Sequence, residues 1–196
     1  MNTWIEFYSE FFQSRSEAIS FVERIENIAA DNPIHPSRII MHQTQRLISL
    51  ADDMPKIRPQ RESLQLIFLM ICAENVSKLH ANFNGDGLSK AYTKRFFMEI
   101  LPEEPRECFR RCFMRDDWSA MTVDQVVSAL YEVRCDVVHE GKYWGFNLPK
   151  EGRQMLNQAP DLIVRASYQD LRRFVVLGCI EAIQTYSPSN LPIKSK

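Results

Sequence analysis

The sequence predicts an all-α fold, and three observations lead to this prediction. Long segments repeat apolar residues at helical spacing, prolines fall between these segments, and only 6 of the 196 residues are glycine. A sandwich or barrel would instead show many short alternating runs with frequent turn residues. With 45% hydrophobic and 25% charged residues, the composition is that of an ordinary globular protein. A chain of this length is expected to form one globular domain.

The first 55 residues are predicted to form an N-terminal helical segment. Apolar positions recur at helical spacing across 3–30, so one long helix is expected there. Two prolines in 32–36 end it. Ser37 can cap a second helix that runs to about Ala51, and Pro55 is expected to open the next loop.

Residues 60–186 are predicted to form a helical bundle around one central helix. That helix is expected over 63–80, where apolar residues lie on nearly every side. Glu74 is unexpected inside it, because an unpaired buried carboxylate is unfavourable. Either Glu74 has a partner within the bundle or it faces solvent near the helix end. The sequence leaves both possibilities open.

Two shorter helices are expected over 89–101 and 105–115, on either side of a proline-containing break. They carry more basic than acidic residues, and this excess could face RNA. The alternative is a solvated helix face with pairs at helical spacing.

The last part of the bundle contains two long predicted helices. Thr122 is expected to cap a helix through Val138, and Gly141 can close it in a left-handed conformation. A polar and aromatic loop follows over 142–160, with one helical turn near Gln154. The final helix is expected from Ser167 to about Tyr186, and residues 187–196 are expected to be a flexible tail.

Charge and cysteine content limit the possible functions. A formal net charge of -1 excludes a protein that binds nucleic acid through its overall charge. The five cysteines are an odd number, and the N-terminus lacks a signal-peptide pattern, so we expect free thiols and a cytoplasmic location. Cys108 and Cys112 lack a second pair at zinc-site spacing and are expected to be buried. The longest apolar run, near 66–73, is too short to span a membrane.

Arg134 and His139 are the main candidate functional residues. Arginine binds phosphate through forked hydrogen bonds, and histidine is the side chain that titrates near neutral pH. Five residues turn a continuous helix by about 500°, which leaves the two side chains about 140° apart. They converge only if the helix ends or bends near Val138. His139 would then lie at a helix C-terminus, where the dipole favours the imidazolium form.

Such a pair is suited to cleaving RNA. An imidazole can take the proton of the ribose 2′-hydroxyl or donate one to the departing 5′-oxygen. A guanidinium stabilises the charge that develops on the phosphorane oxygens. Because one histidine cannot easily act as acid and base together, a twofold dimer that brings two pairs together is expected.

The segment Arg134-Cys-Asp-Val-Val-His139-Glu-Gly, after a helix that carries Tyr131, resembles the Arg-x4–6-His motif of HEPN domains. The resemblance covers about 60–186. Within the family, the chain resembles the stand-alone and abortive-infection types of HEPN protein. It implies a dimeric helical bundle, a metal-independent ribonuclease in toxin–antitoxin or defence systems, and RNA or an antitoxin as partner, without cofactor. Arg134 and His139 match the motif, with Asp136, Glu74 and Tyr131 as supporting residues. Cys135 departs from it, because active members often carry Asn or another polar residue there.

Other interpretations of the same residues remain open. Arg134 could pair with Glu74 or Asp136 inside the bundle, with His139 as an ordinary residue of the helix end. The chain would then be a non-catalytic module for dimerisation or partner binding. A small-molecule or nucleotide binder is a third possibility, although no glycine-rich phosphate loop supports it.

Overall fold

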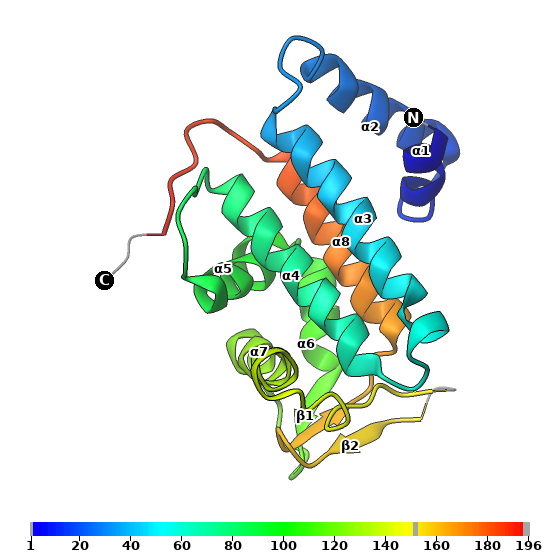
Figure 1. The fold of residues 1–196 in the computed structure, drawn as a ribbon, viewed down its shortest axis with the longest axis vertical. Coiled ribbons are helices and arrows are strands. Elements are labelled where there is room, and N and C mark those ends of the chain that lie inside the picture. Colours follow the sequence, from blue (N-terminus) through cyan, green and yellow to red (C-terminus); the bar gives the residue numbers. More distant parts are fainter. Residues whose placement is uncertain (1, 151–152, 194–196) are drawn as a thin grey trace.

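The computed structural model describes residues 2–150 and 153–193, and these residues are mostly helical (Figure 1). The helices are α1 Asn2–Ser9, α2 Arg15–Ile28, α3 Pro36–Ile57, α4 Glu62–His80, α5 Ser89–Arg95, α6 Glu103–Arg111, α7 Val123–Glu140 and α8 Tyr168–Gln184, with a π-helical turn η1 Phe96–Ile100 after α5. The short strands are β1 Phe113–Arg115, β2 Met155–Asn157 and β3 Leu162–Val164. The mainly helical class is therefore confirmed, whereas the small sheet was not expected.

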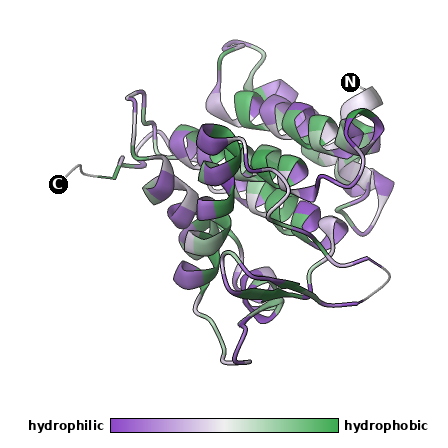
Figure 2. Ribbon diagram, turned by 60° about the horizontal axis from the view of Figure 1, so that its bottom comes forward, coloured by the Kyte–Doolittle hydropathy of each residue, from purple (hydrophilic) through white to green (hydrophobic). Residues whose placement is uncertain are grey.

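Helix α4 is the central helix of the bundle. It packs against α3 and α8 on one side and against α5 and α7 on the other. Figure 1 shows α3, α4 and α8 running together, with α7 seen nearly end-on below them. In Figure 2 the hydrophobic residues line the facing sides of these helices. Because α4 has neighbours on most sides, the prediction of a central helix over 63–80 is confirmed.

The single helix predicted over 3–30 is wrong, because the chain turns between α1 and α2. The side chain of Ser14 accepts a hydrogen bond from the backbone N–H of Glu17, which caps the start of α2. The turn lets both short helices pack beside α3. The hydroxyl of Tyr8 donates to the carbonyl of Met41 over 2.9 Å, so α1 is fixed to α3.

Pro55 does not open a loop, because α3 continues through it to Ile57. A proline inside a helix has no N–H for the carbonyl four residues earlier. Here that carbonyl belongs to Ala51, and it accepts a hydrogen bond from the side-chain amide of Gln65 over 3.1 Å. The donor on α4 replaces the missing one, so the helix continues past Pro55 to Ile57.

The helix predicted over 105–115 ends at Arg111, and the chain then enters the sheet. Strand β3 lies in the middle of the order β1-β3-β2 and is antiparallel to both neighbours. Its three residues 162–164 are all buried, which suits a short central strand covered by the helices. Strand β2 stands where a helical turn was expected near Gln154, and that prediction is wrong.

A buried arginine joins the N-terminal helices to the bundle. The guanidinium of Arg172 on α8 donates to Glu10 over 2.6 Å and to Asp52 on α3 over 3.0 Å. It also lies over the rings of Phe7 and Phe11, 5.5 and 5.2 Å from their centroids. One side chain therefore connects α1, α3 and α8.

The described part of the tail, 187–193, lies against the C-terminal end of α4. The side-chain amide of Asn82 donates to the carbonyls of Ser187, Pro188 and Asn190 over 3.3, 3.2 and 3.1 Å. The flexible tail was expected to begin at Ser187, yet this part of it is hydrogen-bonded to the bundle. Residues 194–196 of that prediction lie outside the described residues.

Candidate functional site

Helix α7 carries the candidate residues, and its ends are fixed as the sequence predicts. The side chain of Thr122 accepts from the N–H of Gln125, whose side chain accepts in return from Thr122, which forms a capping box. Gly141 closes the helix with a φ of 66°, a left-handed conformation that suits glycine. The last helical residue is Glu140, two residues beyond the expected end at Val138.

Arg134 is half-buried between α7 and α4. Its Nη2 lies 3.8 Å from Oε2 of Glu74, and its guanidinium lies 5.3 Å from the centroid of the Tyr131 ring. Arg134 therefore has an acidic and an aromatic neighbour. Of the two possible partners inside the bundle, the structure brings Glu74 to Arg134.

Glu74 is buried and is contacted by two cations. Nζ of Lys78, one helical turn later on α4, lies 2.8 Å from Oε1, while Arg134 lies near Oε2. The interpretation that Glu74 has a partner inside the bundle is thus confirmed, and the alternative that it faces solvent is wrong. Lys78 was missed in the sequence, although the spacing of four residues from Glu74 on a predicted helix could have indicated it.

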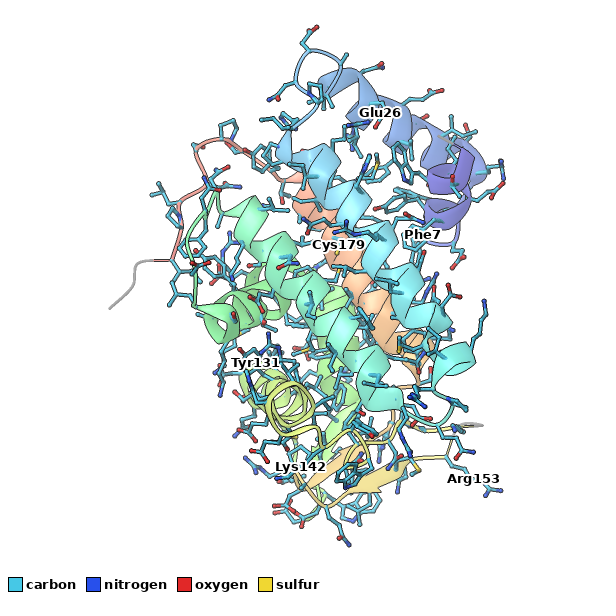
Figure 3. All side chains as sticks on the ribbon, in the orientation of Figure 1. Phe7, Glu26, Tyr131, Lys142, Arg153 and Cys179 are labelled. Atoms are coloured by element: carbon cyan, nitrogen blue, oxygen red, sulfur yellow. The ribbon has the colours of Figure 1, made fainter. Side chains whose placement is uncertain are left out.

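Tyr131 lies between two basic side chains. Nζ of Lys90 on α5 lies 6.0 Å from the ring centroid, in addition to Arg134. Figure 3 shows Tyr131 on the side of α7 that faces α5, whereas Lys142, two residues after α7 ends, lies on the side away from α5. Burial raises the pKa of the Tyr131 phenol, and the charge of Arg134 partly offsets this effect. The hydroxyl is therefore protonated at neutral pH and can act as a hydrogen-bond donor.

His139 lies apart from this cluster. It is exposed in the last turn of α7, which continues without a break to Glu140. The expected ending or bend near Val138 is therefore wrong. On a continuous helix the side chains of Arg134 and His139 remain about 140° apart. The structure does not bring the two candidates together within one chain.

Cys135 and Asp136, which lie between the two candidates in the motif, are half-buried. The backbone carbonyl of Asp136 accepts from the N–H of Gly141 and from that of Lys142, so it belongs to the helix cap. Its side chain has no hydrogen bond or ion pair within the described residues. No such contact is seen for Cys135, the residue that follows Arg134, within the described part of the chain.

Exposed apolar side chains surround the end of α7. Val138, Tyr143 and Trp144 are 48%, 41% and 62% exposed, and the two aromatic rings meet edge to face with centroids 5.4 Å apart. The segment is anchored, because the hydroxyl of Ser63 donates to the carbonyl of Tyr143. The guanidinium of Arg61 lies 5.7 Å from the Tyr143 ring. Exposed apolar side chains therefore precede and follow His139 along the chain.

The remaining histidines have structural surroundings that the sequence did not indicate. His80 is buried, and its ring lies 3.1 Å from the guanidinium of Arg95 and 3.2 Å from the hydroxyl of Thr185. Burial and the nearby charge of Arg95 lower the pKa of His80 to about 4. His35 caps α3, and the ring of His42 packs on Trp4. None of these contacts reaches α7.

The cysteines are distributed between core and surface. All five lie in the described part of the chain and none is in a disulfide. Cys72 and Cys179 are buried, with their sulfur atoms 3.8 Å apart. Cys108 is exposed and Cys112 half-buried, so the prediction that both are buried is wrong. Over residues 2–150 and 153–193, no group of three or more His, Cys, Asp or Glu side chains is arranged to hold a metal ion.

Comparisons with known proteins found no relative of this chain. Neither the models of protein families, nor the curated proteins, nor the solved structures match this chain. Among the described residues, no helix combines the length and the apolar character that crossing a bilayer requires.

Proposed function

We propose that this chain is a metal-independent endoribonuclease of the HEPN type that acts as a homodimer, with Arg134 and His139 as catalytic residues. One observation carries the proposal. Arg134 is held in a basic and aromatic cluster, while His139, five residues later on the same helix, is exposed at the helix end. A group suited to binding phosphate and an exposed group suited to proton transfer are thus carried by the same helix, five residues apart and on different sides of it.

The cluster around Arg134 suits a phosphodiester. Arg134, Lys78 and Lys90 supply three positive charges against the single carboxylate of Glu74. The 3.8 Å separation between Arg134 and Glu74 is too long for a strong hydrogen bond, so the guanidinium keeps N–H donors for a ligand. Those donors can bind the non-bridging oxygens as negative charge develops on them.

A second copy of the chain supplies what one chain lacks. In cleavage, His139 takes the proton of the 2′-hydroxyl, and the oxygen attacks the phosphorus. His139 of the partner subunit donates a proton to the departing 5′-oxygen. The products are a 2′,3′-cyclic phosphate and a 5′-hydroxyl end. The exposed Val138, Tyr143 and Trp144 support such a dimer, because pairing of two α7 ends would bury them.

A second candidate function is a non-catalytic HEPN-like module for dimerisation or partner binding. The contact between Arg134 and Glu74, together with the Tyr131 ring, favours it, since these neighbours give Arg134 a structural role. In this case Arg134→Ala lowers stability and the protein does not turn over RNA.

Incubation with single-stranded RNA in the presence of a chelator separates the two functions. We expect cleavage with 5′-hydroxyl ends by the native protein and none by His139→Ala. Glu132→Ala, an exposed change on the same helix, is the control and should cleave normally. Cleavage that persists in His139→Ala, or that stops with chelator, contradicts the mechanism. Absence of native cleavage favours the binding module.

Growth during expression tests the biological setting of a toxin or defence ribonuclease. Expression of the native chain should slow growth, and His139→Ala should restore it. Equal growth with both chains contradicts a toxin. Co-expressed neighbouring genes that relieve the effect would identify an antitoxin partner.

A further inference from the structure

A cavity of about 410 Å³ lies between α1, the start of α3 and the loop that precedes it. Its volume falls in the range of small-molecule sites, about 300–1,000 Å³. The lining residues used below are Trp4, Arg38, His42, Gln43 and Arg46. In Figure 3 this region is the end of the molecule marked by Phe7 and Glu26, away from Lys142 and the end of α7.

The charged side chains that line the cavity are both basic. Arg38, His42 and Arg46 recur every four residues, so they share one face of α3. Arg38 is already engaged, with Nε 3.0 Å from Glu26 and Nη1 3.3 Å from the carbonyl of Pro33. Arg46 is exposed and has no ion pair within the part of the chain that the structure describes. Its guanidinium is available to an anion.

Two buried polar atoms of the lining residues have no hydrogen-bond partner among the described residues. They are Nε2 of His42 and Oε1 of Gln43. A buried polar atom without a partner is unfavourable, because it has lost its hydrogen bonds to water. Burial, followed by the charge of Arg38, lowers the pKa of His42, so its ring is neutral at pH 7. Both residues line the cavity, so rotation of their side chains towards it would let a ligand that offers both a donor and an acceptor pair with these atoms.

Trp4 adds a flat aromatic wall. Its ring packs against that of His42, with centroids 4.2 Å apart and an angle of 48° between the planes, and it also lines the cavity. Aromatic walls favour planar ligands, which can lie offset on the ring. The cavity therefore combines an aromatic wall, a hydrogen-bonding edge and an arginine.

We propose that this cavity binds a small anion that carries a planar heterocycle. The heterocycle lies against Trp4, its hydrogen-bonding edge faces His42 and Gln43, and its anionic group binds Arg46. This site is separate from the proposed ribonuclease site and does not rest on it. It assigns a binding role to α1 and the first half of α3, which the HEPN resemblance leaves unexplained.

Isothermal titration of the full chain tests the proposal with matched probes. Adenosine monophosphate is compared with adenosine and inorganic phosphate, and nicotinate with nicotinamide. At least one ring-bearing anion should bind about tenfold more tightly than its neutral analogue and than phosphate, as expected for one additional charge-assisted contact. Tighter binding of adenosine monophosphate indicates a phosphate ligand, and tighter binding of nicotinate a carboxylate.

Three variants, one of them a control, locate the site. Arg46→Gln should weaken binding of that anion about tenfold, while Arg111→Gln, an exposed arginine on α6, should leave it unchanged. Both positions are exposed, so neither change affects folding. Trp4→Phe keeps an aromatic ring and should weaken binding less than Arg46→Gln. The proposal is overturned if neither anion exceeds phosphate, or if Arg46→Gln binds as tightly as Arg111→Gln.

Discussion

Arg134 lies 3.8 Å from the carboxylate of Glu74, a full ångström farther than the 2.8 Å that separates Lys78 from the same carboxylate. The ammonium of Lys78 is therefore hydrogen-bonded to Glu74, whereas Arg134 forms an ion pair with Glu74 without a hydrogen bond. Removing Arg134 leaves Glu74 with a partner, but removing Glu74 leaves two half-buried cations without one. The stability of this group of three side chains thus depends more on Glu74 than on Arg134.

Glu74→Gln should lower the free energy of unfolding by about 2 kcal/mol, because Lys78 and Arg134 then repel each other with no counter-ion. Urea denaturation at pH 7 measures this change. Glu132→Gln removes the same charge from an exposed position of α7 and should stay within about 0.5 kcal/mol of the native protein. Equal stability of the two variants would show that Glu74 contributes no more than a surface charge.

Gly178→Ala should destabilise the bundle by about 1–3 kcal/mol through overpacking. A Cβ at residue 178 on α8 would lie 2.5 Å from Cζ of Phe96, which is buried in η1. The second change Phe96→Leu should restore part of the loss, since it removes the atoms that clash. A double-mutant cycle followed by thermal unfolding gives this coupling. Additive effects of the two changes would contradict the close contact.

Acid should destabilise the protein through His80. Its pKa is lowered to about 4 in the folded chain, whereas a histidine in the unfolded chain titrates with its ordinary pKa of 6.5. Between these values the unfolded state binds more protons, so stability is fully present above 6.5 and falls as the pH drops towards 4. The free energy of unfolding of His80→Gln should therefore depend less on pH across this window. Identical pH profiles would contradict a neutral buried imidazole.

If the proposed dimer forms through the end of α7, Trp144→Glu should shift it to monomer and reduce the proposed RNA cleavage, because a charge at an apolar contact opposes association. Sedimentation velocity measures the first effect. Trp118→Glu is the matched control, since Trp118 is also exposed but lies in the turn after β1. A native chain that sediments as a monomer at high concentration would remove the basis for a shared active site.

The sequence predicted the helices whose pattern is local. The long apolar run marked α4, and Thr122 and Gly141 marked the ends of α7 within two residues. It did not predict the strands, because each has only three residues and because β1 pairs with β3, about 50 residues later in the chain. Within the site, Arg134 and Glu74 were proposed as partners from their types alone. The contribution of Lys90 depends on how α5 packs on α7, which spacing does not encode.

Because Gln65 donates a hydrogen bond to Ala51, the residue that is tolerated at position 55 depends on the residue at position 65, ten positions later in the sequence. A residue other than proline at position 55 has its own N–H for the Ala51 carbonyl, and Gln65 is then released from this task. Among descendants of this sequence, positions 55 and 65 should therefore change together: proline is tolerated in the last turn of α3 only while a donor on α4 stands in for it.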